Sequence, residues 1–195
     1  MLAGSERAES SSGMKEHRGW FKVPGVQWGD RTLEEQVMGL DAVKGRSVLD
    51  IGCAEGLISR WLCGRGAKHA DCVGRIVDEL EAGRRLCAGY PIHFHCADLR
   101  KMEQVRGLRL RRQYDVVLLL SIVHKMLDPL PLLEWAAGKA RHTIAVRVPA
   151  RTYTDRGNPP QSHDIEAQLA PFGWTVEANP ETCRGEWLGI FTRSR

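Results

Sequence analysis

A turn rich in small residues follows the first apolar run of the chain and is the strongest candidate for ligand binding. Gly52 and Gly56, with the small Ala54 between them, allow a tight turn and a close approach of a ligand to the backbone. A helical pattern begins at Leu57, so free N–H groups of a helix lie just beyond the turn. Asp50 precedes the glycines and would repel a pyrophosphate. The turn therefore favours a ligand with an ammonium group or other hydrogen-bond donors, the alternative being a strand–helix turn without a ligand.

Short apolar runs alternate with helical patterns over most of the chain. The continuous apolar run at 114–121 indicates a strand buried on both faces. Alternating strands and helices predict an α/β fold with a Rossmann-like, doubly wound, seven-stranded and mostly parallel sheet, with helices on both faces. The last two strands suggest an antiparallel C-terminal edge. Ligands of such sheets bind beyond the carboxyl ends of the strands. The predicted strands are 47–51, 72–77, 92–96, 114–121, 142–148, 174–178 and 187–192, and the predicted helices are one that starts at Thr32, then 57–63, 78–87, 130–140 and 164–172.

The D-x-G-x-x-x-G pattern from Asp50 to Gly56 resembles motif I of the class I S-adenosylmethionine-dependent methyltransferases. The strand at 114–121 resembles motif IV of the same family, and the similarity extends over roughly residues 43–193. The resemblance implies that S-adenosyl-L-methionine is the cofactor. It also implies that the turn after the first strand, with Asp50, Gly52, Ala54 and Gly56, forms part of its binding site.

The resemblance also assigns the residues after the second and third strands. Ile76 stands where the family has an acid that holds the ribose hydroxyls, and Asp78 supplies that carboxylate if the strand runs two residues further. Otherwise Asp78 is an N-cap. Asp98 matches the family's acid that accepts the adenine amino proton, with Ala97 and Leu99 flanking the purine. The alternative for Asp98 is that it caps the short helix that follows.

The loop after the fourth strand is similar to one in many small-molecule and some tRNA methyltransferases, in which a histidine follows the strand. The resemblance places Ser121 and Ile122 on the methionine side of the site. His124 is the candidate general base for an oxygen or nitrogen nucleophile, because the unperturbed pKa of histidine is about 6.5. His124 could instead hydrogen-bond a loop carbonyl. Lys125 either binds an anionic group of the substrate or is solvated.

Two further groups of residues bear on the substrate. Arg147, at the end of the fifth strand, could pair with a carboxylate or phosphate of the substrate or neutralise a surface acid. The densest basic cluster could contact nucleic-acid phosphates, but it has no interleaved aromatic residues, which favours a solvated face. This cluster consists of Arg100, Lys101, Arg106, Arg109, Arg111 and Arg112.

Composition limits the class of protein. The chain has 195 residues with 28 Lys+Arg against 24 Asp+Glu, a formal net charge of +4, and 43% apolar residues. No apolar stretch approaches the ~18 residues of a membrane span, and none of the six cysteines forms a C-x-x-C pair. We therefore expect a cytoplasmic protein with free thiols, without a metal site and without membrane contact. Residues 1–19 are predicted to be a disordered tail and 20–195 a single domain, with an N-terminal strap and helix at 20–42 and the cofactor-binding core at 43–195.

Together these features predict an S-adenosylmethionine-dependent methyltransferase that moves a methyl group to O or N of a small molecule. The first alternative is an RNA methyltransferase, plausibly acting on tRNA, that uses its arginine-rich surface for phosphates. The second is a catalytically silent cofactor-binding or scaffold protein, because Ile76 occupies the ribose position. The oligomeric state is left open.

Overall fold

The computed structural model describes residues 40, 43–148, 162–178 and 187–193. The predictions for the tail at 1–19 and for most of the strap and helix at 20–42 fall outside these residues, as does the loop at 149–161.

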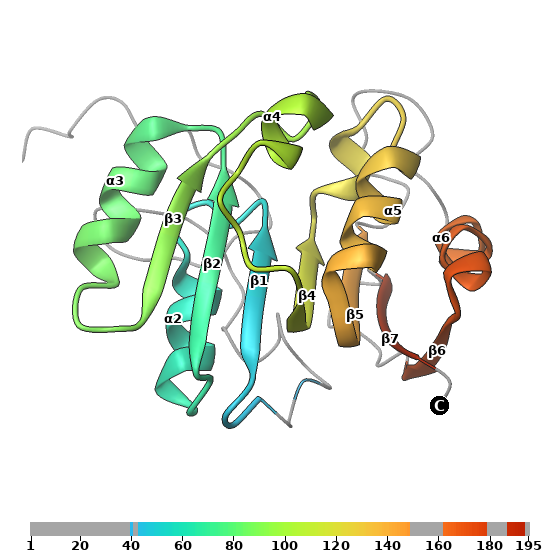
Figure 1. The fold of residues 1–195 in the computed structure, drawn as a ribbon, viewed down its shortest axis with the longest axis horizontal. Coiled ribbons are helices and arrows are strands. Elements are labelled where there is room, and N and C mark those ends of the chain that lie inside the picture. The colour runs from blue at the N-terminus through green and yellow to red at the C-terminus, as the bar shows by residue number, and fades with distance from the viewer. Residues whose placement is uncertain (1–39, 41–42, 149–161, 179–186, 194–195) are drawn as a thin grey trace, which may run out of the picture. The chain divides into compact units, whose positions relative to one another are not determined.

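A seven-stranded sheet in the order β3-β2-β1-β4-β5-β7-β6 forms the centre of the fold (Figure 1). Strands β1 to β5 pair in parallel, and β7 runs antiparallel to both β5 and β6. The predicted α/β sheet with an antiparallel C-terminal strand is confirmed, and within the final pair β6 is the outermost strand. The strands are β1 Ser47–Ile51, β2 His69–Gly74, β3 Ile92–Cys96, β4 Tyr114–Leu120, β5 Ala140–Val148, β6 Trp174–Ala178 and β7 Trp187–Arg193.

Helices pack on both faces of the sheet because side chains along the strands alternate between its faces. Val48 packs in the same cluster as Leu62 of α2, whereas Leu49 packs with α5 and α6 on the opposite face. Leu80 brings α3 to the α2 side, in a smaller cluster with Cys72. The helices are α2 Leu57–Gly64, α3 Val77–Leu86, α4 Met102–Arg106, α5 Leu130–Lys139 and α6 Ser162–Leu169, with 3-10 turns η1 Val123–Lys125 and η3 Ala170–Phe172.

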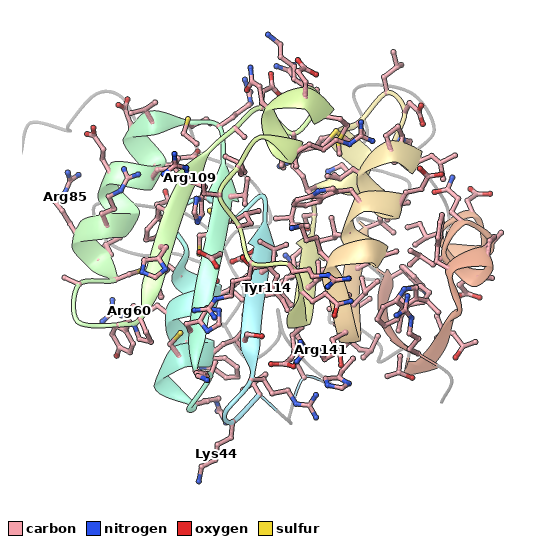
Figure 2. The ribbon with its side chains drawn as sticks, viewed as in Figure 1. Lys44, Arg60, Arg85, Arg109, Tyr114 and Arg141 are labelled. Atoms are coloured by element: carbon pink, nitrogen blue, oxygen red, sulfur yellow. The ribbon has the colours of Figure 1, made fainter. Side chains whose placement is uncertain are left out.

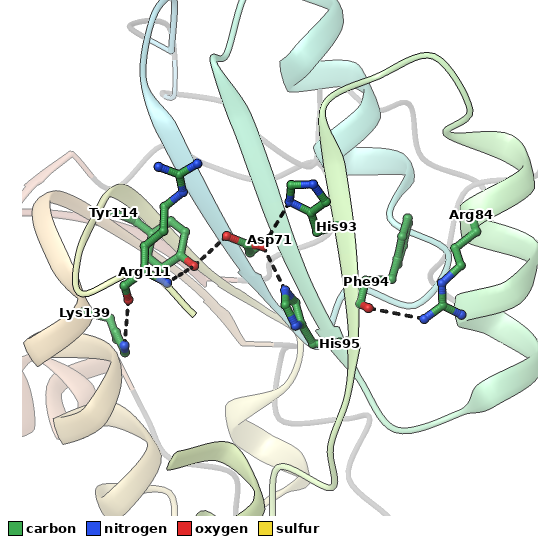
Figure 3. A network of polar contacts seen from close by, with 8 residues as sticks. All are labelled: Asp71, Arg84, His93, Phe94, His95, Arg111, Tyr114 and Lys139. Atoms are coloured by element: carbon green, nitrogen blue, oxygen red, sulfur yellow. Dashed lines mark hydrogen bonds and ion pairs between the residues drawn. The ribbon is translucent and has the colours of Figure 1, made fainter. Parts of the chain in front are cut away.

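The prediction for the second strand is wrong by three residues, since β2 is His69–Gly74 and not 72–77. Its first half carries the polar residues His69 and Asp71, which are nevertheless buried. Asp71 accepts hydrogen bonds from the Tyr114 hydroxyl at 2.6 Å and lies 2.8 Å from His95 Nε2 (Figure 3). These polar contacts replace the apolar run by which a buried strand is normally recognised in a sequence.

The cysteines in the described part of the chain, at 53, 63, 72, 87 and 96, are free thiols. Among the described residues, no helix has the length and apolarity needed to cross a bilayer, and no three metal-ligating side chains converge.

Candidate functional site

The turn between β1 and α2 has a left-handed backbone at three alternate positions. The φ angles are 86° at Gly52, 48° at Ala54 and 69° at Gly56. The Gly52 amide donates to the Val73 carbonyl at 2.8 Å, which fixes the turn to the end of β2. Glycine suits such angles without strain, whereas Ala54 adopts one despite its Cβ. The predicted tight turn is therefore present.

Close contacts hold this turn between two other elements. A Cβ on Gly52 would lie 3.0 Å from the side chain of Ile122, beyond the end of β4, and one on Gly56 would lie 2.8 Å from the ring of Phe94 on β3. The absence of a side chain at both positions allows these approaches. The structure thus brings together Gly52 and Ile122, two predicted site residues that are far apart in the sequence.

Asp50 is buried at the carboxyl end of β1, with an exposed fraction of 3%. Its Oδ2 accepts a hydrogen bond from the Ser59 hydroxyl at 2.8 Å. Desolvation raises the pKa of Asp50 to about 6, against the opposing effects of the Ser59 hydrogen bond and the charge of Arg147. Burial of a carboxylate is unfavourable unless positive charge or donors compensate it. The described neighbours of Asp50 therefore compensate the cost of burying its charge only in part.

Glu55, within the same turn, is a second buried carboxyl group that the sequence analysis did not single out. Its exposed fraction is 6%, and its Oε2 has no hydrogen-bond partner among the residues that the structure describes. Desolvation raises the pKa of Glu55 to about 7, and the charge of Glu79 adds to the increase. Nothing in its position within motif I indicated burial, because an acid in a turn is ordinarily solvated.

The residues after β2 differ from the prediction. The strand ends at Gly74, Ile76 is the N-cap of α3, and Asp78 lies exposed in the first helical turn. Asp78 is therefore neither at the end of the strand nor an N-cap. Glu79 is half-buried beside it, and its charge affects the pKa values of Glu55 and Lys125. Glu79, which the sequence analysis missed, is the acid of this segment that lies toward the turn after β1.

Asp98 follows β3 between two buried apolar residues, Ala97 and Leu99. The Arg100 guanidinium donates to both carboxylate oxygens of Asp98, from Nε at 2.9 Å and from Nη2 at 2.6 Å. These hydrogen bonds lower the pKa of Asp98 far below its usual value. The helix-cap alternative is wrong, because the N-cap of α4 is Lys101 and no side chain caps that helix.

Ser121 and Arg147 link the ends of β4 and β5. Ser121 has a φ of 59°, its amide donates to the Arg147 carbonyl at 2.9 Å, and its hydroxyl accepts from Arg147 Nε at 3.0 Å. The exposed fraction of Arg147 is only 3%. A buried guanidinium therefore lies at the same end of the sheet as Asp50, and its charge acts on that carboxyl group.

His124 and Lys125 lie in the 3-10 turn η1, immediately beyond β4. His124 is half-buried. The pKa of Lys125 is lowered, chiefly by desolvation and further by the charges of Arg75 and Arg147, while Glu79 opposes the decrease. The histidine predicted as a base thus lies at the carboxyl end of the sheet. The lysine next to it has a pKa that depends on the charges of Glu79 and Arg147.

Comparison with solved structures identifies the fold. The chain is similar to a magnesium protoporphyrin IX methyltransferase from Synechocystis PCC 6803 solved with bound SAH, with 19% identity, 81% of this chain and 78% of that chain covered, and a TM-score of 0.62. It is similar to an S-adenosylmethionine-dependent methyltransferase from Mesorhizobium loti (15% identity, 83% and 98% covered, TM-score 0.67). It also resembles a TehB-like SAM-dependent methyltransferase from Corynebacterium glutamicum, with 13% identity, 85% of this chain and 90% of that chain covered, and a TM-score of 0.65.

The chain therefore has the fold of the class I S-adenosylmethionine-dependent methyltransferases. No family model matches its sequence, and no curated protein matches it.

Proposed function

We propose that this protein is an S-adenosylmethionine-dependent methyltransferase. The observation that carries the proposal is a pair of desolvated carboxyl groups at the carboxyl end of β1, with Asp50 before the left-handed turn and Glu55 within it. Burial raises the pKa values of both, to about 6 and about 7. Such groups are stabilised by a ligand that brings positive charge and hydrogen-bond donors.

S-adenosylmethionine fits these residues chemically, since it carries an ammonium group, a sulfonium and ribose hydroxyls. When bound, it supplies an electrophilic methyl group. In our proposal the turn with Asp50, Gly52, Ala54 and Gly56 holds its amino-acid part, and Ser121 and Ile122 lie on the methionine side. Ala97 and Leu99 offer buried apolar surface beside Asp98 for the adenine.

We assign the ribose-binding carboxylate to Glu79 in place of Asp78. Glu79 is half-buried and coupled electrostatically to Glu55 and Lys125, whereas Asp78 is exposed. In this proposal the first turn of α3 supplies, one residue after Asp78, the carboxylate that the end of a longer β2 would have supplied. This assignment removes the reason for considering the protein catalytically silent.

In this proposal Asp98 accepts a hydrogen bond from the adenine amino group, while the Arg100 guanidinium stays hydrogen-bonded to the Asp98 carboxylate. Each carboxylate oxygen can accept more than one hydrogen bond, so the Arg100 fork leaves acceptor capacity on Asp98. Arg100 also keeps the carboxylate ionised and restricts its orientation. It is a positioning residue for the adenine contact.

Methyl transfer to oxygen or nitrogen requires alignment of the acceptor and removal of its proton. His124 is the proposed base because it follows β4 directly at the carboxyl end of the sheet. Lys125 and the buried Arg147 bring positive charge to the same region, which suits a small acceptor with an anionic group. A carboxylate or phosphate on the acceptor would then orient its nucleophile.

Methylation of RNA is the second candidate. It is favoured by the concentration of exposed cations at the opposite end of the sheet, around Lys68 and Arg112. Activity on RNA would require the nucleotide to reach His124 while the phosphates contact other parts of the surface.

Calorimetric titration with S-adenosylmethionine tests the central proposal. We expect micromolar binding that weakens as the pH falls from 8 to 5, because protonation of Asp50 and Glu55 removes their attraction for the ammonium group. Asp50→Asn should weaken binding at pH 8 by roughly tenfold, the equivalent of about 1.4 kcal/mol. Glu81→Gln, a change of the same kind at an exposed position of α3, should leave it unchanged. Undetectable binding of the unmodified protein at millimolar cofactor would contradict the proposal.

The base and the acceptor are tested separately. His124→Ala should lower methyl transfer while affinity for the cofactor is kept, and full activity of this variant would exclude His124 as the base. Mass spectrometry of ligands that co-purify with the protein gives the acceptor class directly. An anionic small molecule is expected, and a copurifying RNA would favour the second candidate.

A further inference from the structure

Basic residues lead into the parallel strands of the sheet. The three positions that precede each of β1, β2, β4 and β5 contain at least one lysine or arginine and no acid. In Figure 2, which has the orientation of Figure 1, Lys44 and Arg141 lie toward the lower end of the sheet, where the parallel strands begin. We call this end the amino-end basic surface, which consists of Lys44, Arg46, Lys68, Arg111, Arg112, Lys139, Arg141 and Arg193.

These residues come from adjacent strands and form one continuous band. The Lys68 amide donates to the Arg46 carbonyl at 2.7 Å, so the segments before β2 and β1 are neighbours. Lys139 Nζ donates to the Arg111 carbonyl at 2.8 Å, which joins the segments before β5 and β4 (Figure 3). Because β7 is antiparallel, its last residue, Arg193, lies at this end as well. Four strand-to-strand steps of about 4.8 Å give the band a length of roughly 20 Å.

The carboxylates at this end do not neutralise the band. Asp115 accepts hydrogen bonds from the Ser47 amide and hydroxyl at 2.8 and 2.7 Å, and Arg141 is the arginine near it, at 3.5 Å. Asp71 is buried and bound by Tyr114 and His95. Both carboxylates are engaged by hydrogen bonds within the fold, although the Asp115 side chain is partly exposed.

Most of the cations have no ionic partner within the described part of the chain. No described carboxylate lies within ion-pair distance of Lys44, Arg46, Lys68, Arg111 or Arg112. All five except Arg46, which is half-buried, are exposed. Their charge extends into the core, where Arg111 and Lys68 add to the desolvation that lowers the pKa of the buried His69. Uncompensated positive charge over such a band attracts polyanions.

The chemical character of the surface favours a phosphodiester backbone over a protein or a membrane. Four of the large apolar side chains that the described residues expose, Ile76, Val77, Leu127 and Leu130, follow β2 and β4 at the opposite end of the sheet. Tyr90, before β3, is the one near the basic surface. Protein interfaces usually have an apolar centre, and membrane-binding surfaces insert apolar side chains. A band of arginine and lysine without such a centre is typical of contacts with nucleic-acid phosphates.

We propose that the amino-end basic surface binds nucleic acid through its phosphate backbone, without reading its sequence. The surface lies at the opposite end of the parallel strands from the proposed cofactor site. Binding there is therefore independent of the cofactor and can hold a nucleic acid whether or not it is the methyl acceptor.

The test measures anisotropy of a labelled 20-nucleotide single-stranded RNA with the full chain, from 50 to 200 mM salt. We expect binding that weakens steeply with salt, with a slope near −0.7 per phosphate contact. The variant K68Q/R111Q/R112Q removes three exposed cations of the surface. It should weaken binding by roughly tenfold or more and reduce the magnitude of the slope by about 2. The same measurement is made with a DNA strand of the same length. Equal affinity for DNA and RNA indicates a general phosphate contact, and weaker binding of DNA indicates a preference for RNA.

The matched control R85Q/K101Q/R106Q removes the same charge from exposed positions outside the surface, and it should retain affinity. Thermal melting and cofactor calorimetry establish that each variant is folded, and K68Q/R112Q replaces the triple variant if that one does not fold. Equal losses in variant and control would overturn the proposal, since they would reflect net charge alone. So would an absence of RNA and DNA binding, including the case in which polyglutamate or phosphatidylserine vesicles bind instead. A cofactor site that fails its own test leaves these outcomes unaffected.

Discussion

The carboxyl groups of the candidate site oppose the stability of the fold that contains them. Asp50 is buried, accepts a side-chain hydrogen bond from Ser59 within the described part of the chain, and has its pKa raised by desolvation from 3.8 to about 6. A raised pKa means that the folded protein binds a proton more readily than the unfolded chain, so this carboxyl group destabilises the fold as the pH increases from 4 to above 6. Residues retained at such a cost commonly serve binding or catalysis.

Asp50→Asn should therefore stabilise the cofactor-free protein at pH 7.5. Two pKa units correspond to about 3 kcal/mol, which sets the upper limit of the gain. At pH 4 the carboxyl group is protonated in the folded protein and only partly ionised in the unfolded chain, so most of the gain should be lost. Thermal melting at the two pH values measures the difference. An equal effect at both would show that the charge of Asp50 is not the cause.

A second comparison at the residue scale separates two neighbouring acids of α3. Glu79→Gln should weaken binding of S-adenosylmethionine by roughly tenfold, the loss of one charge-assisted hydrogen bond. Asp78→Asn should leave it unchanged, because Asp78 is exposed. Calorimetry at pH 8 provides both values. The reverse pattern would restore Asp78 as the ribose-binding residue.

At the scale of the elements, α3 packs closely against the turn after β1 because Gly83 has no side chain. A Cβ at this position would lie 2.6 Å from the Phe94 ring and 2.8 Å from the Glu55 carbonyl oxygen. The carbonyl is part of the backbone and cannot move aside alone. The packing of α3 therefore sets the position of the turn that carries Glu55 and Gly56.

Gly83→Ala should destabilise the protein by about 1–3 kcal/mol and weaken cofactor binding, since α3 must move away from the turn. Gly138, in α5, provides the matched control because a Cβ there meets nothing within 4 Å. Gly138→Ala should stabilise the protein by about 0.5–1 kcal/mol through helix propensity. Chemical denaturation measures both effects. Stabilisation by the two alanines alike would mean that α3 is not closely packed.

The sequence predicted the strands whose burial is apolar and misplaced the one whose burial is polar. β4 differs from its predicted bounds by one residue, because its apolar run is continuous. β3 has its predicted bounds although His93 and His95 interrupt its apolar residues. β2 was shifted because His69 and Asp71 are polar yet buried by contacts with other strands. The same shift places Asp78 in the first turn of α3 and not at the end of β2. The burial of Glu55 and Arg147 depends on how distant elements pack, which no local pattern contains.

At the scale of the whole described fold, one polar network joins β3 and β2 to β4, across the intervening β1. Asp71 on β2 is bound by Tyr114 on the far side of β1 and by His95 on β3 (Figure 3). The pKa of Asp71 is lowered because these contacts and the neighbouring histidine charges outweigh desolvation. The pKa of His69 is lowered as well, chiefly by desolvation. Both shifts favour the folded state at neutral pH over acidic pH.

Burial disfavours protonation of His69 in the folded protein relative to the unfolded chain, so the fold is destabilised as the pH falls through the ordinary pKa of histidine, near 6.5. His69→Leu should therefore reduce the decrease in melting temperature between pH 7.5 and 5. It should also raise stability at pH 5 by about 1 kcal/mol, because neither ring nitrogen has a described hydrogen-bond partner. An unaltered pH profile for His69→Leu would assign the acid sensitivity to other groups.

The position of β7 has a consequence for the order in which the chain folds. β7 lies between β5 and β6, although it follows both in the sequence. While the chain is being synthesised, β5 and β6 have no direct pairing with each other, and the edge of β5 stays open until residues 187–193 leave the ribosome. An open edge in the middle of a sheet is a template for pairing with other chains. Aggregation of nascent or truncated chains should therefore begin at β5, and completion of the described sheet depends on β7.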